Sequence, residues 1–77
     1  MSEQDFSFRI QNTRASRLKI WLEPLGELHL LEPGKKLKVE VRGPLGQAPN
    51  DALEIHANEE GITLWEWSGS SIAANKL

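Results

Sequence analysis

Hydrophobic residues alternate with polar residues along most of this chain, and this alternation excludes most folds. Between Leu37 and Val41, for example, the apolar positions are separated by Lys38 and Glu40. Successive side chains of a β-strand point to opposite faces, so a period of two predicts a half-buried strand. The same alternation marks about six candidate strands, near residues 6–11, 17–23, 27–31, 36–42, 53–57 and 62–67.

The candidate strands are short and separated by Gly, Pro and Asn, which is typical of all-β proteins. The chain has 77 residues and no cysteine, so it is long enough for one domain and has no disulfide framework. We therefore predict a small antiparallel β-sandwich, with a pattern like that of immunoglobulin-like domains, or an open barrel. It is a single β domain over residues 1–77, with residues 1–5 and 69–77 as flexible tails.

Two proline-glycine segments predict how the middle strands pair. The Pro24–Gly26 segment suits a three-residue hairpin loop, which would place Leu22 opposite Leu28. The Pro33–Gly34 dipeptide suits a type II turn and predicts a second hairpin directly after the first. Both registers would place the aliphatic side chains on one face of a three-stranded meander.

The opposite face of that meander then carries a candidate binding surface. Trp21, His29 and Lys38 would form one row across the sheet, with Lys19 and Lys36 beside it. An indole ring flanked by an imidazole and ammonium groups can stack on a planar or anionic ligand, or hold a partner chain. The alternative is that Trp21 simply covers the sheet, with the lysine stems lying across its ring.

Trp65 and Trp67 fall on one face of the last candidate strand, and the preceding turn decides which face that is. If Asn58–Gly61 forms a type I turn with a bulge, the register places both indoles in the core, and we favour this form. A four-residue loop would slip the pairing by one residue and turn both indoles outward.

The chain carries no motif for catalysis or for a cofactor. It has no Gly-x-Ser-x-Gly elbow, no phosphate-binding glycine loop and only two histidines. We therefore predict no catalytic residues, no cofactor and no metal site. The expected function is that of a non-enzymatic binding or protein-interaction module, and an enzyme is the least favoured interpretation.

The partner expected for such a module is a protein or a small anionic ligand. A net charge of −2 does not favour nucleic acid, and no apolar run is long enough to cross a membrane. The polar N-terminus is unlike a signal peptide, so we expect a cytoplasmic protein. For its oligomeric state we expect a monomer or a weak homodimer. An alternative function is self-assembly through the last strand, where Ile62 and Leu64 oppose the two tryptophans.

Overall fold

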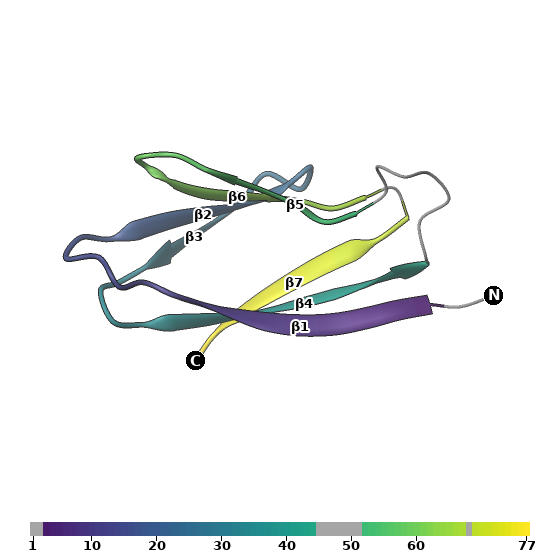
Figure 1. Ribbon diagram of the computed structural model, residues 1–77, viewed down its shortest axis with the longest axis horizontal. Coiled ribbons are helices and arrows are strands. Elements are labelled where there is room, and N and C mark those ends of the chain that lie inside the picture. The colour runs from purple at the N-terminus through teal and green to yellow at the C-terminus, as the bar shows by residue number, and fades with distance from the viewer. Residues whose placement is uncertain (1–2, 45–51, 68) are drawn as a thin grey trace.

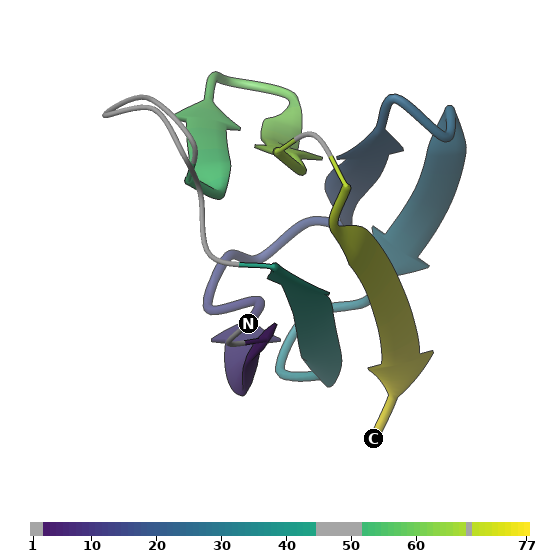
Figure 2. The same ribbon diagram turned by 90° about the vertical axis from the view of Figure 1, so that its right-hand side faces the viewer.

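Seven β-strands in two stacked sheets form the described part of the protein. The computed structural model describes residues 3–44, 52–67 and 69–77. The strands are β1 (Glu3–Gln11), β2 (Leu18–Glu23), β3 (Glu27–Leu31), β4 (Lys36–Pro44), β5 (Glu54–Ala57), β6 (Gly61–Trp65) and β7 (Ser71–Lys76). One sheet has the order β1-β4-β7 and the other the order β3-β2-β6-β5 (Figures 1 and 2). The predicted small all-β sandwich is confirmed, with seven strands instead of about six.

The hydrophobic core lies between the two sheets, as the alternation predicts. On β2 and β4, every second residue is apolar and faces inward. The buried hydrophobic side chains are Leu18, Ile20, Leu22, Leu31, Leu37, Val39, Val41, Leu64, Trp67 and Ile72. Among the described residues, no helix is long and apolar enough to span a membrane.

The hairpin of β2 and β3 forms, but its register differs from the prediction by one residue. Leu22 lies opposite Glu27 and Trp21 lies opposite Leu28, because the loop holds four residues instead of three. A slip of one residue moves every side chain of a strand to the other face. Leu28 is therefore on the outer face of the sheet, where it is 46% exposed, and not in the core.

The turn at Pro33–Gly34 also forms, but it does not close a hairpin. The Lys35 N–H donates to the Glu32 carbonyl at 3.1 Å, and Gly34 has φ +80°, as a type II turn requires. The strands before and after this turn belong to different sheets. The predicted pairing of residues 27–31 with residues 36–42 is therefore wrong, and the turn is a crossing between the layers.

Asn12 fastens this crossing. Its backbone N–H donates to the Lys35 carbonyl at 2.9 Å, and its carbonyl accepts from the Gly34 N–H at 2.7 Å. Its fully buried side chain donates from Nδ2 to the carbonyls of Ser16 and Leu31, both at 2.8 Å. We call this place, formed by Asn12 and residues 32–35, the crossing end. Sequence reasoning missed Asn12 because its partners lie both in the segment that follows it and in residues 31–35, far along the chain.

One strand pair is parallel, which an all-antiparallel sandwich does not predict. β2 pairs in parallel with β6, so that Lys19 lies opposite Gly61 and Leu22 opposite Leu64. A Cβ atom at Gly61 would overlap the Lys19 carbonyl oxygen. The missing side chain of Gly61 thus permits the two backbones to approach at the start of the pair.

The two segments expected to be flexible tails contribute to strands. Ser71–Lys76 forms β7, which pairs antiparallel with β4 and buries Ile72 in the core. Residues 3–5 begin β1, opposite residues 42–44, and residues 1–2 lie outside the described part of the chain. The prediction failed for these segments because it relied on their polar, small-residue composition, whereas β4 offers an edge for pairing on each of its sides.

Candidate functional site

The outer face of the four-stranded sheet carries the candidate site. The registers place Leu28, Trp21, Thr63 and His56 in one row across β3, β2, β6 and β5. Trp21 thus has a histidine in its row, but it is His56 and not the predicted His29.

The neighbouring row places an exposed indole between two carboxylates. Trp65 of β6 lies opposite Glu23 of β2 on one side and opposite Glu54 of β5 on the other. Its side chain is 41% exposed. Around it lies a shallow depression lined by Trp21, Glu23, His56, Asn58, Thr63 and Trp65.

The turn before β6 explains why Trp65 faces outward. Asn58 Oδ1 accepts from the N–H groups of Glu60 and Gly61, at 2.8 and 3.1 Å, and the Asn58 N–H donates to the Gly61 carbonyl at 2.9 Å. Ala57 therefore pairs with Ile62 across a four-residue loop. The favoured bulged register is wrong, and the four-residue alternative is the one that forms.

The two tryptophans of this segment consequently have different environments. β6 ends at Trp65, so the strict alternation does not continue to the next tryptophan. Trp67 is buried, 7% exposed, and stacks on Phe6 with ring centroids 6.4 Å apart. The expectation of a core position is correct for Trp67 and wrong for Trp65.

The predicted binding surface is not assembled as one row. Trp21 is half-buried on the outer face and Lys19 lies two residues before it on the same strand. His29 pairs with Ile20 and so faces the other side of the sheet, where its Nε2 lies 2.6 Å from Glu27 Oε1. Lys36 and Lys38 are on β4, in the other sheet. Of the five residues, the registers thus bring Trp21 together only with Lys19.

His56 is positioned on the candidate face by a neighbour on its own strand. Its Nε2 lies 2.7 Å from Glu54 Oε1, two residues earlier on β5. Both side chains are more than half exposed, so such a contact adds little to stability. Within the described ranges, no group of three or more His, Cys, Asp or Glu side chains is placed to hold a metal ion.

We define the tryptophan face as Trp21, Leu28, Leu30 and Trp65 together with Glu23 and Glu54. Its apolar members form a patch on what would otherwise be a solvated sheet surface, the usual mark of an interaction site. Alternation alone identifies Trp21, Glu23 and Glu54 as outward-facing. Leu28, Leu30 and Trp65 depend on two registers that differ by one residue from those expected.

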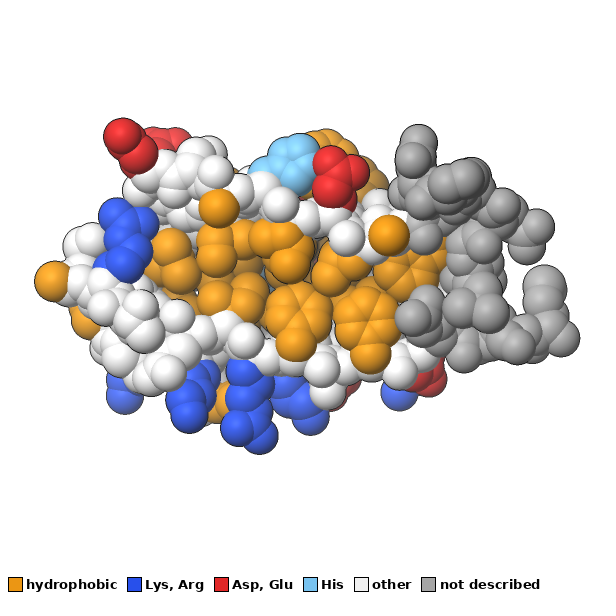
Figure 3. Space-filling view, in the orientation of Figure 1, with side chains coloured by type: hydrophobic (Ala, Val, Ile, Leu, Met, Phe, Trp, Pro, Cys, Tyr) orange, Lys and Arg blue, Asp and Glu red, His pale blue; other side chains and the backbone are white. Residues whose placement is uncertain are grey.

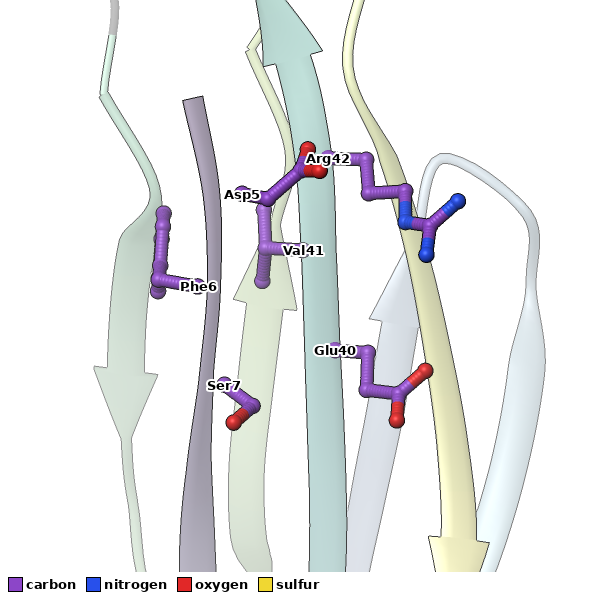
Figure 4. A pocket seen from close by; sticks show the side chains of 6 residues that line it. All are labelled: Asp5, Phe6, Ser7, Glu40, Val41 and Arg42. Carbon is purple, nitrogen blue, oxygen red and sulfur yellow. The ribbon is translucent and has the colours of Figure 1, made fainter. Parts of the chain in front are cut away.

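The outer face of the three-stranded sheet has a different chemistry. Lys and Arg side chains gather along it (Figure 3), and its outward positions include Arg9, Lys36, Lys38 and Arg42. A second shallow depression lies there, lined by Asp5, Phe6, Ser7, Glu40, Val41 and Arg42 (Figure 4). Phe6 points to the opposite side of the sheet from Asp5 and Ser7. The depression lies between β1 and β4 and is open to solvent.

Comparison with protein-family models, with curated proteins and with solved structures finds no match for this chain.

Proposed function

We propose that this protein is a non-enzymatic interaction module that binds a partner protein on its tryptophan face. The observation that carries the proposal is the row in which Trp65 lies between Glu23 and Glu54. An arginine or lysine side chain placed over the indole would gain a cation–π contact. The same cation would then have the carboxylates of Glu23 and Glu54 on its two sides, so the indole and both carboxylates favour a cationic side chain.

The charge of the face selects between partners. Lys19 is the cation that accompanies Trp21, whereas Lys36 and Lys38 belong to the other sheet. With two glutamates flanking Trp65, the face attracts cationic groups and repels anionic ones. We therefore propose a basic protein segment, and not a small anionic molecule, as the partner.

The apolar part of the face supplies the second half of the recognition. Trp21 lies opposite Leu28, and Trp65 is two positions further along the neighbouring strand in the parallel register. Large apolar side chains at the centre of a polar surface are the residues that dominate binding energy at protein interfaces. In an extended segment only every second side chain points to the face, so a segment with basic and apolar residues two positions apart would place both kinds on it.

Two short peptides test the charge preference. The tryptophan indole N–H signals of the protein are followed by NMR during titration with acetyl-Arg-Ser-Leu-Ser-Arg-amide and with acetyl-Glu-Ser-Leu-Ser-Glu-amide, which carry the charged and apolar side chains on one side of an extended chain. We expect the basic peptide to shift the signals of Trp21 and Trp65, and the acidic peptide to shift neither. Trp67 is buried in the core and serves as the internal control.

Matched variants test the row itself. Glu23→Gln and Glu54→Gln keep the side-chain shape, and each should weaken binding of the basic peptide about two- to fivefold, the size of an exposed charge contact. Glu59→Gln, in the loop beyond the face, should have no effect. Equal responses to both peptides, or shifts that spare Trp21 and Trp65, contradict the proposal. A response only to a neutral oligosaccharide such as cellohexaose would assign the face to sugar stacking instead.

A further inference from the structure

One side of the sandwich is not closed. β1 is the edge strand of the three-stranded sheet and β5 the edge strand of the other, and both lie on the same side of the molecule (Figures 1 and 2). Ile55 of β5 pairs with the buried Leu64, so it faces inward, yet it is 55% exposed. A band of hydrophobic side chains is visible between the two layers here (Figure 3). We call this the open side.

β1 presents a long free edge at the open side. It is nine residues long, and β4 covers only one of its two edges. Its inward residues Phe6, Phe8 and Ile10 pack against the core but remain partly exposed. Natural proteins usually block such an edge, because unpaired backbone groups beside apolar side chains invite pairing with another strand.

The sequence of β1 is complementary to itself about Ser7. In an antiparallel pair of two β1 strands with a twofold axis at Ser7, Phe6 of one copy would lie opposite Phe8 of the other. In the same pair, Asp5 would lie opposite Arg9 of the second copy. The pair therefore contains two aromatic contacts on the inner face and two opposite-charge contacts on the outer face, and each kind stabilises cross-strand pairing.

Asp5 and Arg9 of β1 have no ion-pair partner among the described residues. Arg9 lies opposite Lys38, a like charge. Asp5 lies opposite Arg42, but the Arg42 side chain extends over β7, away from β1 (Figure 4). The carboxylate and the guanidinium on β1 are thus free to meet their counterparts on a second copy.

The aromatic side chains of β1 belong to a row of rings that a second copy would double. Trp67, Phe6 and Phe8 are already in sequence, with ring centroids 6.4 Å and 6.3 Å apart. The second copy would place its own Phe8 and Phe6 beside this row, opposite Phe6 and Phe8, and would cover apolar surface that is now exposed at the open side.

We infer that two copies of this chain associate through β1, in the antiparallel register centred on Ser7, and join their three-stranded sheets into one. This interface differs from the predicted self-assembly through the last strand. β6 lies between β2 and β5 and has no free edge, and Leu64 is buried. The inference is independent of the tryptophan face, which belongs to the other sheet.

Charge reversal tests both the interface and its register. In a homodimer of Asp5→Arg, the introduced arginine of each copy would meet Arg9 of the other. In a homodimer of Arg9→Asp, the introduced aspartate of each copy would meet Asp5 of the other. Each variant alone should therefore dimerise about tenfold more weakly than the wild type by sedimentation equilibrium, as two attractive contacts become repulsive. Mixed in equal amounts, the two variants should form a heterodimer more tightly than either variant pairs with itself, because one of its two contacts joins the introduced arginine to the introduced aspartate and the other joins Arg9 to Asp5.

If mixing the two variants restores association, the weaker association of each single variant comes from the contacts of this register and not from its changed net charge. Glu40→Arg, on the neighbouring strand of the same outer face, is the control and should leave association unchanged. Circular dichroism of each variant checks that the sandwich is intact. A wild-type chain that stays monomeric at millimolar concentration overturns the inference. So do single variants that associate as the wild type does, or a mixture that fails to form the heterodimer.

Discussion

The crossing end and the open side of the sandwich differ in how completely polar groups have hydrogen-bond partners and apolar side chains are buried. At the crossing end, the buried Asn12 side chain has partners for its donor and its acceptor, because Arg14 N–H donates to Oδ1 at 2.9 Å. At the open side, inward-facing apolar side chains remain partly exposed beside a free strand edge. The first region therefore holds the two sheets together, while the second leaves surface available for another chain.

The largest expected effect comes from two residues that lie opposite each other on β5 and β6. Leu64 is fully buried and Ile55 is 55% exposed, although both face inward. Leu64→Ala should lower the free energy of unfolding by about 2–5 kcal/mol, because it leaves a cavity. Ile55→Ala should lower it by less than about 1 kcal/mol.

Urea unfolding followed by circular dichroism measures both changes in free energy. The two residues are cross-strand neighbours, so the comparison contrasts an inner strand with the edge strand beside it. Equal losses would mean that the open side is as well packed as the centre, and the comparison between the two regions would then fail.

The next largest effect is expected at Asn12. Asn12→Ala removes the donor for the carbonyls of Ser16 and Leu31. The contact with Leu31 is buried, and a buried carbonyl without a partner should lower the free energy of unfolding by about 1–3 kcal/mol. Ser16→Ala is the control, because it keeps the backbone carbonyl that Asn12 contacts. If Asn12→Ala and Ser16→Ala unfold at the same urea concentration, the crossing end does not hold the sheets together.

The smallest expected changes in stability are those at two glycines in turns. Gly34 and Gly26 have φ +80° and +73°, and a Cβ at either position would meet nothing within 4 Å. Alanine at each should cost about 1 kcal/mol from backbone strain alone. Thermal unfolding of the two variants sharpens the comparison. A clearly larger loss at Gly34 would show that its hydrogen bond to the Asn12 carbonyl is also lost, whereas no loss at either position would contradict the strain argument.

The sequence predicts the fold class and the positions of the turns, but not the registers. Each hairpin loop lies where its Gly, Pro or Asn residues indicate, yet both loops hold four residues instead of three. This difference of one residue places Leu28 and Trp65 on the outer face. The number of loop residues depends on local hydrogen bonds, such as those of Asn58, which composition does not reveal.

The choice of sheet is a second property that alternation does not encode. A strand at the Pro33–Gly34 turn can fold back in its own sheet or cross to the other, and its pattern of apolar residues is the same in both cases. Here the deciding contacts come from Asn12, more than twenty residues away. For the candidate site, alternation identifies the outward face of Trp21, while its neighbours on β5 and β6 follow only from the long-range pairing.

The parallel pair of β2 with β6 also constrains the order in which the protein can form. β2 obtains its second partner only after the chain has been extended past residue 65. During synthesis, β2 therefore has no partner on its second edge until β6 has been made. An isolated two-stranded hairpin is only marginally stable in water, so the hairpin of β2 and β3 is not stable before that point. Pairing between distant segments is slow to establish, so we expect folding on the millisecond-to-second timescale of β-sandwiches, in a late and cooperative step.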